Sequence, residues 1–131
     1  MIKKIEQNQL LNIDKLLKEG KIELAIKIAD INIKNRISHI KFLKFIKKTL
    51  IKNQIIDKAP SILKLENLFK ENKLTCAKYY FQTHAKIFFK NPKALLIAGR
   101  VHSELDELNE ALRYFKEALY LEPDNLKIRK Y

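Results

Sequence analysis

The sequence has few of the residues that interrupt helices and almost none that form covalent cross-links. Its 131 residues include two glycines, three prolines, one cysteine and no tryptophan. So few glycines and prolines leave little room for linkers. The single cysteine, Cys76, cannot form an intrachain disulfide, so folding does not depend on an oxidising compartment.

Long hydrophobic runs are also missing. The basic residues near the N-terminus are not followed by an apolar segment of signal-peptide length, and no run approaches the roughly 20 apolar residues of a membrane span. We therefore expect a cytoplasmic protein without a transmembrane segment. Residues 126–131 have the pattern of a helix that is only beginning, as a piece of a longer protein would show.

What the sequence does contain is helical periodicity. Apolar residues recur every three or four positions, whereas the alternation typical of strands never persists. We predict an all-α fold in a single domain covering residues 1–131. The predicted helices are 4–18, 22–34, 36–57, 60–71 and 74–90, followed by two more between Pro92 and Pro123. For 36–57 we favour one long helix, and the alternative is a break at Asn53-Gln54.

The stretch from Pro92 to Asn125 carries the clearest motif. It reads as two amphipathic helices joined at residues 105–107, with small residues on the faces that would meet. This stretch resembles a tetratricopeptide repeat, a unit of about 34 residues with the pattern Trp-x2-Leu-Gly-x2-Tyr, then Ala-x3-Phe, then Pro. The positions that keep the family spacing are Gly99, Ala111, Phe115 and Pro123, and those that depart from it are Leu95, Ala98 and His102.

The same pattern recurs earlier in the chain. Asn72, Ala77 and Phe81 precede Asp106, Ala111 and Phe115 by one repeat length, which makes 58–91 a second repeat and 92–125 the best-matching one. Residues 6–35 resemble a divergent repeat, 36–57 an extra helix, and 126–131 the start of a further one. The resemblance implies helix pairs stacked as a short right-handed superhelix.

The resemblance also implies a function, that of a non-enzymatic adaptor. In this family the first helices of successive repeats line a concave groove that holds a partner peptide or helix. Transferred to this chain, the groove residues are Ile62, Glu66, Phe69, Lys70, Lys93, Leu96, Arg100 and Ser103. This mixture suits a ligand with apolar anchors and some negative charge. Leu96 and Ile97 stand where the carboxylate clamp of chaperone-binding members has polar groups, so that ligand class is not expected.

The charge is strongly positive, at +12, but unevenly distributed. Residues 1–57 carry a net charge of +7, residues 58–91 of +5, and residues 92–131 of zero. Lysine outnumbers arginine 23 to 4, which indicates compositional bias more than a surface that reads nucleic-acid sequence. We expect one basic face, formed by Lys34, Lys41, Lys44, Lys48 and Lys52.

That face has two interpretations. The first is a solvated lysine surface over a packed apolar face. The second is a strip that docks on nucleic acid or an anionic membrane, which is our alternative function. A third interpretation is self-association, in which the unpaired helix completes the array of a second copy and makes a homo-oligomer.

Catalytic chemistry has little support. The three histidines, His39, His84 and His102, lie in three different predicted helices, and none has a second ligand at helical spacing. There is no Gly-rich phosphate loop and no strand to hold a nucleophile. The acids at Glu104, Asp106, Glu107 and Glu110 suit the start of a helix, where they complement its dipole. We expect no enzyme activity, no metal and no cofactor.

Overall fold

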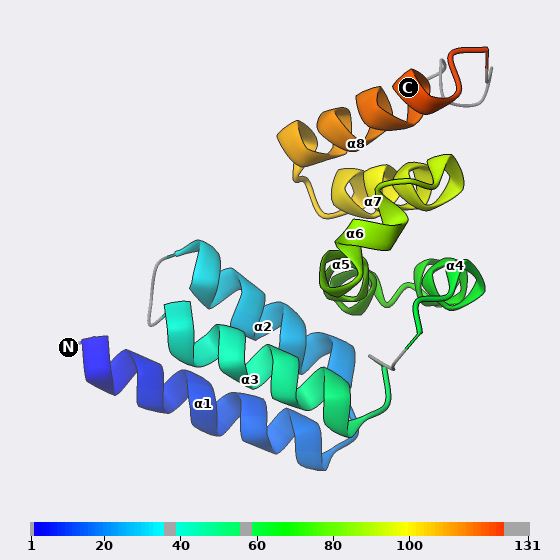
Figure 1. Cartoon of the computed structure of the whole chain (residues 1–131). Coiled ribbons are helices and arrows are strands. Elements are labelled where there is room, and N and C mark those ends of the chain that lie inside the picture. The colour runs from blue at the N-terminus through cyan, green and yellow to red at the C-terminus, as the bar shows by residue number, and fades with distance from the viewer. Residues whose placement is uncertain (1, 36–38, 56–58, 125–131) are drawn as a thin grey trace. The chain divides into compact units, whose positions relative to one another are not determined.

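The computed structural model describes residues 2–35, 39–55 and 59–124, with side chains from residue 8 onward except those of 39 and 40. This part of the chain forms eight helices and no strand, which confirms the all-α prediction (Figure 1). No described helix is long and apolar enough to cross a membrane. The helices are α1 (Ile2–Lys18), α2 (Ile22–Lys34), α3 (His39–Lys52), α4 (Ile62–Lys70), α5 (Leu74–Thr83), α6 (Ala85–Phe88), α7 (Pro92–Glu104) and α8 (Leu108–Leu121).

The contacts divide the chain into two compact units, residues 1–56 (unit 1) and 57–131 (unit 2). In unit 1, α1 and α2 form an antiparallel hairpin, and α3 packs against α2 (Figure 1). The three helices are amphipathic, so their apolar stripes meet in one small core. The fully buried side chains of this core are Ile13, Ala25, Ile26, Ala29, Phe42, Ile46 and Leu50.

Unit 2 contains two antiparallel hairpins, α4/α5 and α7/α8, with the short helix α6 between them (Figure 1). Its core is rich in aromatic rings. Phe81 stacks on Phe88 with ring centroids 5.6 Å apart and meets Tyr114 edge-on at 5.1 Å. The Tyr80 hydroxyl accepts a hydrogen bond of 2.8 Å from the Ser61 N–H, which joins the start of α4 to the middle of α5.

Four helices end in the same way. The residues after α1, α3, α4 and α7 that adopt a positive φ are Gly20, Gln54, Asn72 and Asp106. In each turn that residue and the next donate backbone hydrogen bonds back into the last helical turn, as Asn72 does to Phe69 and Lys73 to Leu68. The interval along the chain from Gly20 to Gln54 equals the interval from Asn72 to Asp106.

The helix predicted over 36–57 ends at Lys52, so its predicted C-terminal end is wrong. Gln54 takes the left-handed conformation (φ 58°), and the Ile55 N–H bonds to the Leu50 carbonyl. Glutamine rarely adopts this conformation, so residue type alone does not predict the stop. The Asn53-Gln54 break, our alternative, is what the structure has. Residues 36–38 and 56–58 lie outside the described part.

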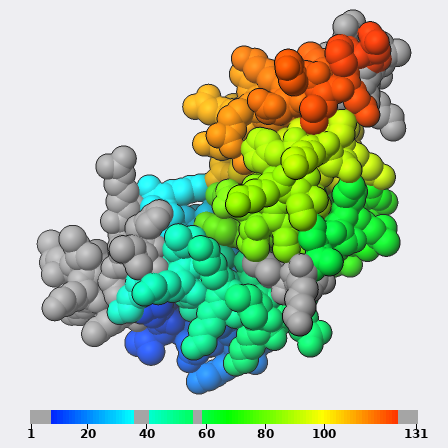
Figure 2. Space-filling model, in the orientation of Figure 1, coloured from blue at the N-terminus to red at the C-terminus, as the bar shows by residue number. Residues whose placement is uncertain are grey.

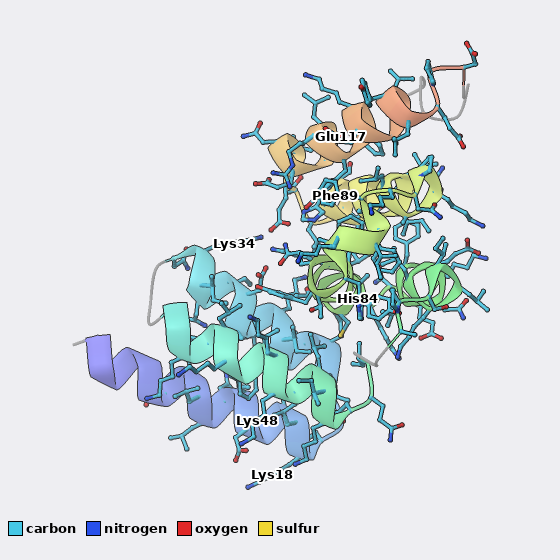
Figure 3. The ribbon with its side chains drawn as sticks, viewed as in Figure 1. Lys18, Lys34, Lys48, His84, Phe89 and Glu117 are labelled. Atoms are coloured by element: carbon cyan, nitrogen blue, oxygen red, sulfur yellow. The ribbon has the colours of Figure 1, made fainter. Side chains whose placement is uncertain are left out.

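The helix predicted over 74–90 is also interrupted, between α5 and α6, at His84 (Figure 3). The Thr83 hydroxyl donates to the Tyr79 carbonyl at 2.8 Å, and the His84 N–H is shared between the carbonyls of Tyr80 and Phe81. A hydroxyl that bonds back one turn bends a helix. The break turns Phe88 into the core, where it is 1% exposed.

Helix starts were predicted more closely. Asn91 caps α7, since its Oδ1 accepts from the backbone N–H of Lys93 and of Ala94, and Pro92 occupies the first turn. The predicted start of α4 at Pro60 is two residues early. Ser61 is the N-cap there, and its Oγ accepts from the Lys64 N–H at 3.2 Å.

Gly99 brings α7 close to α8. A Cβ built on Gly99 would lie 2.4 Å from the ring of Phe115, which is far inside van der Waals contact. The two helices therefore approach this closely only because position 99 has no side chain. The corresponding position of the preceding hairpin, on α4, holds the buried Leu65. The two hairpins share their sequence spacing, but the residue where the paired helices meet, Gly99 or Leu65, determines how closely those helices can pack.

We expect Gly99→Ala to destabilise unit 2, although alanine favours a helix by about 1 kcal/mol over glycine. Overpacking against Phe115 costs about 1–3 kcal/mol, which leaves a net loss of about 1 kcal/mol. All five tyrosines lie in residues 57–131, so tyrosine fluorescence during urea unfolding reports unit 2 alone. In a Phe115→Leu background the same change should cost less or stabilise. An alanine variant more stable than the parent would contradict the contact.

Candidate functional site

Unit 2 has a groove of about 730 Å³ between α4 and α7. In Figure 2 the green surface of α4 adjoins the yellow-green surface of the helices that follow it. Its volume lies within the range of known ligand-binding pockets. The lining residues are Glu66, Phe69, Lys70, Asn91, Pro92, Lys93, Leu96, Ile97, Arg100 and Glu122.

The groove combines an apolar lining with charged side chains. Ile97 is buried, while Phe69 and Leu96 are half-buried and keep part of their surface open. A smaller hollow of about 290 Å³ also contacts Phe69 and Arg100, and its remaining lining residues are Ser103, Glu104 and Phe115. The two hollows together follow the exposed side of α7 over most of its length.

One carboxylate in the groove holds two lysines. Glu66 pairs with Lys70 on its own helix at 3.0 Å and with Lys93 on α7 at 3.3 Å. Hydrogen bonds from Lys70 and then Lys93, together with their positive charge, hold the pKa of Glu66 below its ordinary value. Because this pKa is lowered on folding, the favourable interaction is present at neutral pH and is lost as the pH falls through the lowered pKa.

The predicted groove residues fall into three groups. Six of the eight line the larger hollow, and Ser103 lines the smaller one beside it. Ile62 lines neither and is half-buried at the start of α4. Four lining residues were not predicted, namely Asn91, Pro92, Ile97 and Glu122. Asn91 and Pro92 lie at the start of α7, and Glu122 follows α8.

The lysines of the predicted basic face lie on two helices. Lys41, Lys44, Lys48 and Lys52 are exposed along α3, opposite the buried Phe42, Ile46, Thr49 and Leu50. Figure 3 labels Lys48 on this helix. Lys34 is the last residue of α2 and pairs with Asp30 at 3.5 Å, so it does not belong to the same helical face.

The histidines and Cys76 do not form a metal site in the part of the chain that the structure describes. Cys76 is fully buried on α5. His84 meets the ring of Tyr80 edge-on with centroids 5.2 Å apart and so serves the aromatic core. His39 begins α3, and its side chain lies outside the described part.

Sequence reasoning missed a buried charged network in unit 2. The carboxylate of Glu107, the residue before α8, lies 2.8 Å from the Lys78 Nζ on α5 and 2.7 Å from the His102 Nδ1 on α7. The side chains of Lys78 and Glu107 are 9% and 10% exposed, and that of His102 is 1% exposed. The sequence pattern places Glu107 only at the acidic start of a helix. The available signal was Lys78, a charged residue within the apolar run of α5.

The chain matches no known family model, no curated protein sequence and no solved structure. Function is therefore inferred from the groove, the lysines of α3 and the buried network.

We expect Glu107→Ala to lower the free energy of unfolding of unit 2 by about 3 kcal/mol or more, because it leaves the Lys78 ammonium buried without its carboxylate. Glu117→Ala, on the exposed side of α8, is the matched control and should change stability by less than about 0.5 kcal/mol. Urea unfolding followed by tyrosine fluorescence measures both.

A second change tests the cause. Adding Lys78→Met to Glu107→Ala removes the stranded charge and should recover part of the loss. Equal losses for Glu107→Ala and the control, or no recovery with the added methionine, would contradict a network that depends on charge pairing.

Proposed function

We propose that this protein is a non-enzymatic adaptor, a tetratricopeptide-like helical array that holds a partner peptide or helix in the groove between α4 and α7. The observation that carries the proposal is the groove itself. It is formed by the first helices of two successive hairpins and combines half-buried apolar side chains with three cationic and two acidic ones. Recurrence of the left-handed turn at the spacing of the repeat family supports the repeat relationship.

The chemistry of the groove supports binding over catalysis. Phe69 and Leu96 offer apolar surface to a ligand, and burial of such surface contributes about 25 cal/mol per Å². The charged side chains would orient the ligand and reject mismatched partners. A nucleophile paired with a base is not found among the lining residues.

We expect Arg100→Glu to abolish capture of the partner and to leave the melting temperature nearly unchanged, because Arg100 lines both hollows and is only half-buried. The measurement compares the proteins that each variant retains from a lysate of the cell of origin, identified by mass spectrometry. Lys116→Glu, an equal charge reversal at an exposed position of α8, is the matched control. Equal capture by Arg100→Glu and the parent would place binding elsewhere.

The lysines of α3 favour a second candidate function, docking on nucleic acid or an anionic membrane. Lys41, Lys44, Lys48 and Lys52 extend along one exposed side of a helix that carries no acidic residue. The apolar face of α3 is buried in the core of unit 1, so contact would be electrostatic and could not include insertion of that face into a bilayer.

If these four lysines neutralise about four phosphates, the logarithm of duplex affinity should fall with the logarithm of salt concentration at a slope near −4. Changing all four to Gln should remove the binding while stability stays within about 0.5 kcal/mol per site, since the side chains are exposed. Fluorescence anisotropy of a labelled duplex measures the slope. We expect weak binding that vanishes near physiological salt, and tight binding that persists there would favour this candidate over the adaptor.

A further inference from the structure

Glu66 occupies an unusual place in the groove. Its carboxylate lies where α4 and α7 face each other and takes one lysine from each helix, Lys70 at 3.0 Å and Lys93 at 3.3 Å. The lowered pKa of Glu66 shows that both cations favour its ionised form. Within the groove, therefore, a carboxylate of the protein already fills a position that two ammonium groups recognise.

The three side chains differ in exposure. That of Glu66 is 23% exposed, whereas those of Lys70 and Lys93 are 68% and 65% exposed. The Glu66 carboxylate is thus partly buried, whereas the two lysines extend into solvent and can turn away from it. An exposed ion pair of this kind changes an equilibrium by no more than about five-fold, so a ligand can displace it.

The lining also favours one charge in the ligand. It has three cations, Lys70, Lys93 and Arg100, against the carboxylates of Glu66 and Glu122. A basic ligand would have to take Glu66 from two lysines at once, whereas an acidic ligand needs to attract only Lys93. Phe69 and Leu96 lie along the same groove and suit an apolar side chain next to the acid.

We propose that Glu66 stands in for an acidic side chain of the ligand, and that the groove takes an extended peptide in which an Asp or Glu lies beside an apolar residue. The ligand's carboxylate takes Lys93 from Glu66, while Lys70 stays with Glu66 on the same helix. Glu66 thereby lowers the affinity for acidic peptides and sets the threshold for binding. This inference rests on the proposed adaptor function.

Glu66→Gln is the informative variant, because it keeps the size of the side chain and removes the competing charge. It should tighten binding of an acidic peptide by up to about five-fold at low salt, because the ligand no longer has to take Lys93 from an exposed ion pair. Lys93→Gln should weaken binding. The chain offers a matched control in Glu71 and Lys73, an exposed pair at 3.1 Å just after α4 that does not line the groove. Glu71→Gln and Lys73→Gln should leave binding unchanged.

The probe is a random-peptide library displayed with its C-termini fused to the carrier, selected on the full-length protein and on its Glu66→Gln variant. The enriched peptide is then synthesised with an amidated C-terminus, together with a version in which Asp or Glu becomes Asn or Gln. Fluorescence anisotropy gives affinities for the parent and the four variants at low and physiological salt. Enrichment of acidic, apolar peptides that bind Glu66→Gln more tightly and Lys93→Gln more weakly is the expected result.

The other outcomes separate the two proposals. Apolar peptides without acids, lost on Leu96→Asp, would overturn the role of Glu66 and leave the adaptor function standing. Basic peptides lost on Glu66→Gln would overturn it as well, since Glu66 would then be the recognition group. Equal affinity of the acidic and amide peptides would have the same meaning. Failure to enrich any peptide that depends on groove residues would overturn both.

Discussion

Glu107 joins three helices of unit 2, because it is the N-cap residue of α8 and contacts Lys78 on α5 and His102 on α7. Burial of the Lys78 and Glu107 charges is costly unless they are paired, so packing that brings the helices together is favoured over packing that separates these two groups. Since α5 also packs against α4, the network fixes α4 and α7 indirectly. The groove between α4 and α7 therefore depends on charges that lie outside it.

Periodicity was enough to predict the fold class and most helix starts, and three of the described residues with a positive φ, Gly20, Asn72 and Asp106, also suit that conformation by residue type. Those three are Gly, Asn and Asp, the residue types for which a positive φ is least costly. Gln54 does the same without a sequence signal, which is why the end of α3 was predicted five residues late. The break at His84 depends on a hydroxyl bonding back one turn, and a threonine inside a helix does not always do so.

Only part of the groove could be predicted from the sequence. Six of its lining residues could be named in advance because the resemblance to a tetratricopeptide repeat implies which positions of the first helices face the groove. The ion pair between Glu66 and Lys93 could not be predicted, because Glu66 lies on α4 and Lys93 on α7, in a later hairpin. Periodicity gives the face of each helix, and only the packing of helices determines which charges on two faces meet.

The groove is built from two kinds of residue, buried groups that hold the helices and exposed charges that line the groove. The helix positions are held by buried groups, Glu107 and Gly99 among them, whose replacement is costly. Glu66, Lys70 and Lys93 are partly or largely exposed, so replacing them changes the charge of the groove with little effect on the fold. In the proposed adaptor, ligand selection would therefore vary through the exposed charges while the buried network keeps the same groove open.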